Sequence, residues 1–178
     1  MAKKKAVERV FPLIEMSREK RNKSLFENPK DDKVYNFTIP DYVIDNLKHK
    51  LRSYQAEALF NLNWTQLDDQ ADTLYNQLLF NMATGSGKTD LMAAIMLYMY
   101  GEFNYQEFLF VANSNAVVSK TKENFLNESS IKYLLQGPIT IAGQRILIKG
   151  VDRFPLHPEK GTIYLRLATI QTLANELG

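Results

Sequence analysis

The chain has 178 residues, 45% of them hydrophobic and 24% charged, which favours one globular domain and excludes a wholly disordered chain. Because it has no cysteine, disulfides, zinc fingers, iron–sulfur clusters and a cysteine nucleophile are excluded. No apolar run reaches the roughly 18 residues that a membrane span needs, and no hydrophobic signal region follows the first lysines, so we expect a cytoplasmic protein without a membrane partner.

Positive charge is concentrated near the start of the chain. Residues 1–33 contain ten Lys and Arg and six Asp and Glu, a formal charge of +4, whereas residues 34–178 carry −2. Such an arm can contact a phosphate backbone, although a solvated leader of mixed charge also explains the pattern. We take residues 1–39 as a basic N-terminal arm and linker and residues 40–178 as the folded domain.

Helices and strands alternate in the predicted domain. One helix is expected to start at Pro40-Asp41 and a second at Leu51. The later elements, in chain order, are a strand over 78–82, a helix over 88–100 ended by Gly101, a strand over 108–112, a helix over 115–125, short strands at 139–141 and 146–148, a strand over 162–168 and a helix over 169–177. This alternation predicts an α/β fold, with strands 78–82, 108–112 and 162–168 as parallel neighbours.

A phosphate-binding loop is the strongest signal in the sequence. Residues 83–89 read Ala-Thr-Gly-Ser-Gly-Lys-Thr and stand between a predicted strand and a predicted helix, whose first amides and dipole can hold phosphates. The expected roles are as follows: Thr84, Gly85, Ser86 and Gly87 line the nucleotide, the catalytic Lys88 reaches the outer phosphates, and the catalytic Thr89 also binds Mg²⁺. The predicted cofactors are therefore ATP and Mg²⁺.

One position departs from the general pattern G-x-x-x-x-G-K-S/T, because Met82 stands where the first Gly would be. In this the loop resembles that of superfamily 2 helicases and DNA translocases. Residues 51–58, Leu-Arg-Ser-Tyr-Gln-Ala-Glu-Ala, are similar to a segment of the same enzymes. The resemblance implies that Gln55 reads adenine, and an amide does offer the donor and the acceptor that adenine N6 and N7 require. Taken alone, Gln55 could also be a plain surface residue.

Two downstream segments extend the resemblance to the type III restriction (Res-subunit-like) helicases. The strand 108–112 and the Asn113-Ser114 pair after it are similar to motif Ia, which implies contact with the nucleic-acid backbone. Residues 168–173 resemble the Thr-x-Gln segment, which implies that Thr169 and Gln171 also face the nucleic acid. The alternatives are a helix cap by Asn113 and a helix cap by Thr169.

An ATPase of this kind needs a Walker B strand that ends in Asp-Glu, and no apolar run in the sequence ends in this way. Residues 146–152 come nearest, but they carry one acid, Asp152, and Lys149-Gly150 is expected to interrupt the strand. We therefore expect a P-loop NTPase fold of the RecA-like class, a parallel sheet flanked by helices, truncated before the Walker B strand and without turnover of its own.

The resemblance implies the ATP-binding portion of an ATP-dependent DNA helicase or translocase, the motor subunit of a restriction-modification system. Its partners would be duplex DNA and a methyltransferase (modification) subunit. Two alternatives remain at this point: a nucleotide- or DNA-binding module without turnover, and an unrelated P-loop kinase. Residues 51–58 argue against the kinase, because such enzymes usually start at their phosphate-loop strand.

Overall fold

A computed structural model describes residues 37–67 and 78–177, so the predicted arm over residues 1–33 lies outside the described residues. The described chain falls into two compact units. One contains residues 37–38, 56–67 and 78–81, and the other contains residues 39–55 and 82–177. Helix α3 (Ser53–Leu67) starts in the second unit and continues in the first.

In the first unit, α3 carries the hydrophobic core. Leu59, Phe60 and Leu62 are buried, and the ring centroid of Phe60 lies 6.3 Å from that of Phe37. The predicted strand over 78–82 is wrong, since the structure forms no strand there and Leu79 is 92% exposed. An apolar run becomes a strand only when a neighbouring backbone pairs with it, and no described strand does so.

The second unit is built on a three-stranded parallel sheet in the order β1-β5-β4. Its strands are β1 (Glu107–Ala112), β5 (Thr162–Thr169) and β4 (Leu147–Val151). The predicted parallel pairing of 108–112 with 162–168 is confirmed, with Phe108 opposite Leu165. The central strand β5 is the most buried of the three, as a parallel strand between two neighbours should be.

Strand β4 corrects a second prediction. It runs through Lys149-Gly150 to Val151 without interruption, paired with β5 throughout. The glycine is a packing residue here, because a Cβ at Gly150 would lie 2.5 Å from Cδ1 of Leu126. That leucine ends helix α6 (Asn115–Leu126), which packs against all three strands.

Helix α5 (Lys88–Phe103) follows the phosphate loop and buries six residues, among them Leu91, Met96 and Leu97. It does not stop at Gly101 as predicted. A Cβ at Gly101 would lie 2.4 Å from the ring of Tyr42, a residue of α2 (Asp41–Asp45), so the glycine allows these two helices to pack. The helix instead ends at Phe103, and its C-cap Asn104 takes the left-handed conformation with φ of 57°.

A small hairpin completes the unit. Strands β2 (Thr140–Ile141) and β3 (Gln144–Arg145) pair antiparallel across a two-residue turn in which both residues, Ala142 and Gly143, have positive φ. Asn46, which is 5% exposed, holds this hairpin at the end of α2 by exchanging hydrogen bonds of 2.8 and 2.9 Å with the backbone of Thr140. The predicted short strand at 139–141 is thus β2 of a hairpin, whereas the one predicted at 146–148 belongs to β4 of the parallel sheet.

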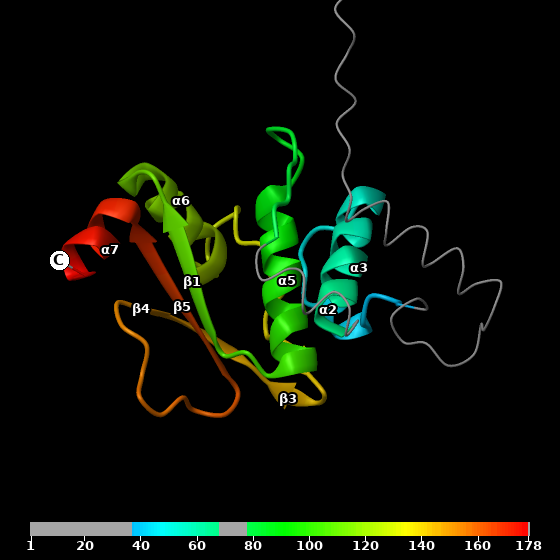
Figure 1. Ribbon diagram of the computed structural model, residues 1–178. Helices are drawn as coiled ribbons and strands as arrows, with labels where there is room; N and C mark the ends of the chain where they lie inside the picture. Colours follow the sequence, from blue (N-terminus) through cyan, green and yellow to red (C-terminus); the bar gives the residue numbers. More distant parts are fainter. Residues whose placement is uncertain (1–36, 68–77, 178) are drawn as a thin grey trace, which may run out of the picture. The chain divides into compact units, whose positions relative to one another are not determined.

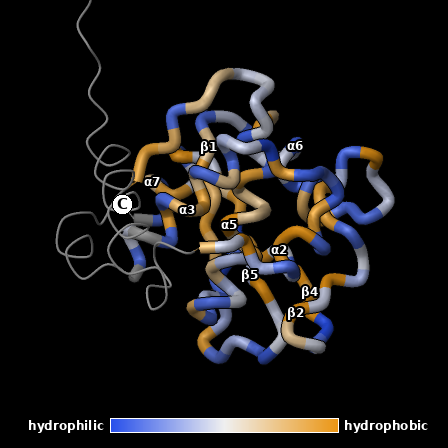
Figure 2. Tube along the Cα trace, turned by 90° about the vertical axis from the view of Figure 1, so that its right-hand side faces the viewer, coloured by the Kyte–Doolittle hydropathy of each residue, from blue (hydrophilic) through white to orange (hydrophobic). Residues whose placement is uncertain are grey.

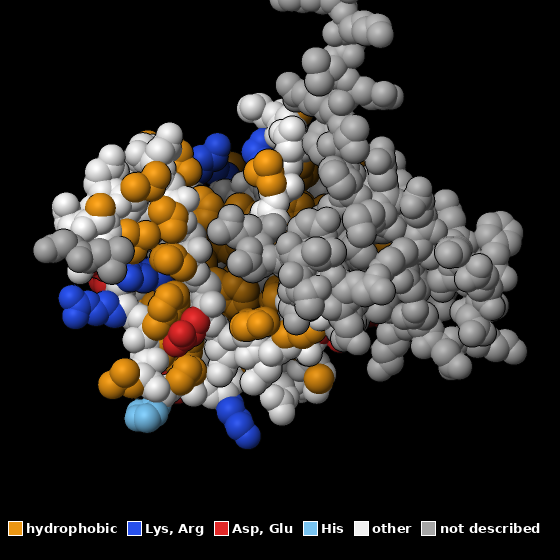
Figure 3. Space-filling model, viewed as in Figure 1, with side chains coloured by type: hydrophobic (Ala, Val, Ile, Leu, Met, Phe, Trp, Pro, Cys, Tyr) orange, Lys and Arg blue, Asp and Glu red, His pale blue; other side chains and the backbone are white. Residues whose placement is uncertain are grey.

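Figure 1 shows the start of α5 and the carboxyl ends of β1 and β5 at the same end of this unit, and α7 (Ile170–Leu177) following β5 there. Figure 2 shows hydrophobic stretches gathered around α5 and the sheet. Figure 3 shows hydrophobic side chains exposed on the left-hand part of this face. In β1, Leu109 and Val111 are 48% and 43% exposed. None of the helices that the structure describes is long and apolar enough to span a membrane.

Candidate nucleotide-binding site

The predicted phosphate loop forms a tight turn directly before α5. Gly85 and Gly87 have φ of 77° and 78°, a conformation that residues with a Cβ rarely adopt. The N-cap of α5 is Gly87, which has no side chain to bond the first amides of the helix. The start of this 16-residue helix therefore offers N–H donors and the positive end of its dipole at the loop.

Side chains of the loop donate hydrogen bonds to carbonyl groups at its start. The ammonium of Lys88 donates hydrogen bonds to the carbonyl oxygens of Met82 and Ala83 at 3.1 and 2.8 Å, and the hydroxyl of Ser86 donates to Ala83 at 2.7 Å. No Cβ contact would arise at Gly85 within 4 Å, so the space in front of that residue is open. All six residues predicted to line the nucleotide, 84–89, thus lie in one loop and the first turn of its helix.

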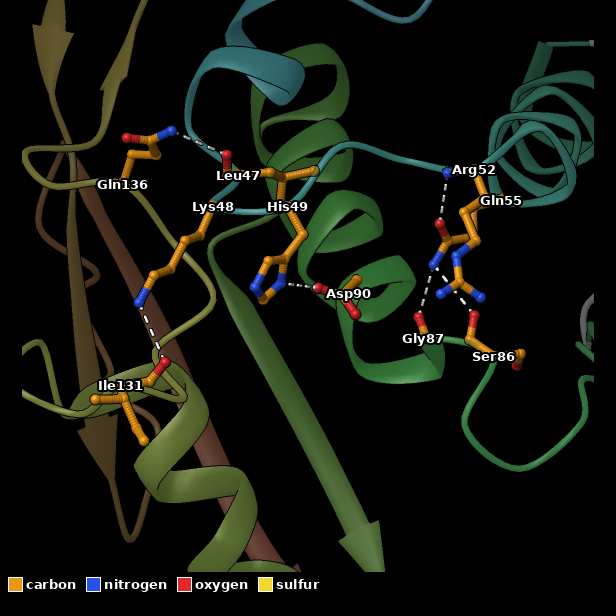
Figure 4. Close-up of polar contacts among 10 residues, drawn as sticks. All are labelled: Leu47, Lys48, His49, Arg52, Gln55, Ser86, Gly87, Asp90, Ile131 and Gln136. Carbon is orange, nitrogen blue, oxygen red and sulfur yellow. Dashed lines mark hydrogen bonds and ion pairs between the residues drawn. The ribbon is translucent and has the colours of Figure 1, made fainter.

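Gln55 comes to this loop from the start of α3 and is 3% exposed, so the interpretation of a surface residue is wrong. Its Nε2 donates to the carbonyl of Gly87 at 2.8 Å and to that of Ser86 at 3.5 Å, and its Oε1 accepts from the backbone N–H of Arg52 at 2.7 Å (Figure 4). A Cβ at Gly87 would lie 2.6 Å from Nε2. The loop and Gln55 are therefore packed against each other.

Three residues that the sequence analysis did not select also belong to the site. The hydroxyl of Tyr54 donates to the carbonyl of Ser86 at 2.7 Å and accepts from Nη1 of Arg52 at 2.8 Å. Tyr54 and Arg52 could have been selected from the sequence, because both belong to residues 51–58, the segment that contains Gln55. His49 had no such signal, since its partner is distant in sequence: its Nδ1 lies 2.8 Å from Oδ1 of Asp90 in the first turn of α5.

The residues predicted to meet nucleic acid lie at the carboxyl edge of the sheet. Ala112 pairs with Thr169 in the β1–β5 register, which places the exposed Asn113-Ser114 pair beside the start of α7. The N-cap of α6 is Ser114, without a side-chain capping bond, so the cap by Asn113 is wrong. Thr169 does cap a helix, because its buried hydroxyl accepts from the backbone N–H of Thr172 at 3.1 Å, whereas Gln171 is exposed.

Comparison with known proteins identifies the family. The profile of the family described as type III restriction enzyme, res subunit, matches residues 48–177, and the chain belongs to this family. Membership implies a RecA-like fold for the parallel α/β unit, and it excludes the unrelated kinase.

One relative is the probable type III restriction-modification enzyme HindVIP Res subunit of Haemophilus influenzae. It is 37% identical over 147 residues, which cover 79% of this chain and 28% of that protein. The chain therefore spans less than a third of the length of this relative. No solved structure matches the chain. The matched residues 48–177 include every residue that we predicted for the site, and the resemblance to the Res-subunit-like helicases is confirmed.

Proposed function

We propose that the unit containing residues 82–177 binds the phosphates of ATP at the 83–89 loop, as part of the motor of a type III restriction-modification system. The observation that carries the proposal is the loop itself, with two glycines of positive φ at the start of a 16-residue helix. Backbone N–H groups and a helix dipole attract phosphate oxygens, and Lys88 adds a full positive charge. To bind phosphate, Lys88 exchanges two carbonyl partners for anionic oxygens.

The residues present fit a nucleotide. Open space in front of Gly85 admits a phosphate, and the Thr89 hydroxyl follows Lys88, where it can supply one ligand to the accompanying Mg²⁺. When bound, Mg²⁺ neutralises phosphate charge. Within the described part of the chain, one lone pair of Gln55 Oε1 accepts from the Arg52 N–H, and the amide oxygen has a second that can accept the N6 hydrogen of adenine.

Duplex DNA is the second proposed ligand, and a modification subunit is the proposed partner within the restriction system. Asn113, Ser114 and Gln171 present exposed polar side chains at one edge of the sheet, and such groups bond phosphate oxygens without reading sequence. In this proposal Thr169 acts indirectly, because its cap fixes the start of the helix that carries Gln171.

Nucleotide binding is tested with the purified 178-residue chain and a fluorescent ATP analogue, displaced by unlabelled ATP. We expect saturable binding that Lys88→Ala abolishes, because the variant removes the charge nearest the phosphates. Lys160→Ala is the matched control: it removes an equal charge from an exposed lysine in the loop between β4 and β5. Equal loss in the two variants would overturn the proposal, since net charge alone would then explain binding.

A further inference from the structure

Two side chains of segment 52–55 donate hydrogen bonds to two consecutive carbonyl groups of the phosphate loop. The Tyr54 hydroxyl donates to the Ser86 carbonyl at 2.7 Å, and Gln55 Nε2 donates to the Gly87 carbonyl at 2.8 Å. The Arg52 guanidinium donates to the Tyr54 hydroxyl at 2.8 Å. Because the guanidinium is only a donor, it occupies a lone pair of that hydroxyl and leaves its proton directed at Ser86. Figure 4 shows Arg52 and Gln55 on one side of the Ser86–Gly87 stretch.

A carbonyl held in one direction fixes an amide in the opposite one. The peptide unit is planar, and in the trans form its C=O and N–H point in opposite directions. The Ser86 carbonyl shares its peptide unit with the Gly87 N–H, and the Gly87 carbonyl shares its own with the Lys88 N–H. Because both carbonyls point toward segment 52–55, both N–H groups point away from that segment. They face the side from which phosphate oxygens would approach.

The hydrogen bonds from segment 52–55 matter because the loop has a glycine, Gly87, at this point. Gly87 has no side chain to restrict its backbone. Its φ of 78° is positive, and glycine adopts positive and negative φ about equally readily. The Gly87 carbonyl is also fixed by the helical bond from Leu91, at 3.1 Å. Among the described residues, the Ser86 carbonyl accepts from Tyr54 at 2.7 Å and from Gln55 at 3.5 Å, so Tyr54 makes the shorter of these two hydrogen bonds.

We propose that Tyr54 is a positioning residue for nucleotide phosphates: its hydroxyl, oriented by Arg52, aims the Gly87 N–H at the ligand through the Ser86 carbonyl. The inference rests on the proposed nucleotide binding. It adds a role for Tyr54 that concerns the phosphates and not the base. A residue that aims a phosphate donor acts equally on ATP, on GTP and on inorganic triphosphate, which has no base at all.

The test is Tyr54→Phe in the 178-residue chain, which removes the hydroxyl and keeps the ring. We expect Kd for ATP, GTP and inorganic triphosphate to rise by the same factor, about fivefold, the worth of one ordinary hydrogen bond. Tyr105→Phe is the matched control, since Tyr105 is a 52% exposed tyrosine beyond the far end of α5, and it should leave all three values unchanged. Melting temperature without ligand is measured in parallel.

A lowered melting temperature with unchanged Kd values would make Tyr54 a structural residue and overturn the inference. A loss of affinity confined to ATP would also overturn the inference, because it would mean that Tyr54 acts on the base and not on the loop. These outcomes leave the proposed function intact as long as binding depends on Lys88. A wild-type chain that binds none of the three ligands overturns the proposed function and this inference together.

Discussion

In the proposed site, the buried amide of Gln55 would serve two groups, the phosphate loop and adenine. Its Nε2 donates to the carbonyls of Gly87 and Ser86, while its Oε1 accepts from the Arg52 N–H. The remaining lone pair can accept the N6 hydrogen of adenine, but the corresponding atom of guanine, O6, is itself an acceptor. The residue is therefore suited to anchor the loop for any nucleotide and to favour ATP over GTP.

This dual role predicts an unequal effect of Gln55→Ala. ATP should lose about 1–3 kcal/mol of binding free energy, because the variant removes both the base contact and the loop anchor. GTP should lose less, since only the anchor is removed. Calorimetric titration of each nucleotide measures the two losses, with GTP as the internal control. Equal losses would show that Gln55 acts on the loop alone and would eliminate the adenine role.

At the scale of elements, the contact between α2 and α5 depends on the absence of a side chain. Gly101 lies inside α5, where glycine is less favourable than alanine by about 1 kcal/mol, yet a Cβ there would lie 2.4 Å from both Cζ and the hydroxyl of Tyr42. The Tyr42 hydroxyl also donates to Glu102 at 2.9 Å. Burial and this hydrogen bond raise the pKa of Tyr42 well above its usual range, so the phenol stays protonated in the helix contact.

Gly101→Ala should therefore destabilise the protein by about 1–3 kcal/mol despite the better helix propensity of alanine, because overpacking a tight contact costs that much. In a Tyr42→Ala background the same change should become neutral or stabilising, since the obstructing ring is gone. Urea unfolding of the four chains gives the coupling free energy. Additive effects in this cycle would mean that Tyr42 is not what the glycine accommodates.

The elements that the sequence predicts well are those whose signal is local. Strand β5 and helix α6 lie where the sequence predicts a strand and a helix, and the phosphate loop follows the spacing of its glycines before Lys88. What could not be predicted depends on distant partners. Periodicity does not reveal that Gly150 makes room for Leu126, or that no strand in the described residues pairs with residues 78–82. For the same reason the contact of His49 with α5 appeared only in three dimensions.

On the scale of the whole unit, the fold gathers its polar segments at one edge. The start of α5 lies at the same end as the carboxyl ends of β1 and β5 (Figure 1), where open α/β sheets bind ligands. The pairing of Ala112 with Thr169 brings the two segments proposed to meet DNA beside each other. A nucleotide at the loop and a DNA backbone at Asn113-Ser114 would thus both bind at this end of the unit.

Among the described residues, this edge carries no Asp-Glu pair of the Walker B kind. No apolar run in the sequence ends in Asp-Glu, and in the described part of the chain no group of three or more His, Asp and Glu residues could hold a metal ion. Of the acids near the loop, Asp90 is paired with His49. Phosphoryl transfer to water needs a positioned water and charge stabilisation in the transition state, and an arginine finger alone contributes about 10³–10⁵ in rate in related GTPases.

We therefore predict that the 178-residue chain binds ATP but hydrolyses it negligibly, because the loop supplies ground-state binding and the absent groups act on the transition state. Phosphate release at saturating ATP, with and without duplex DNA, is the measurement, and Lys88→Ala sets its background. A rate near 1 s⁻¹, the low end of the ordinary enzyme range, that is lost in Lys88→Ala would contradict this prediction. Asp152, the residue that follows β4, would then be the first acid to replace, since it alone stands at the end of a strand that resembles a Walker B segment.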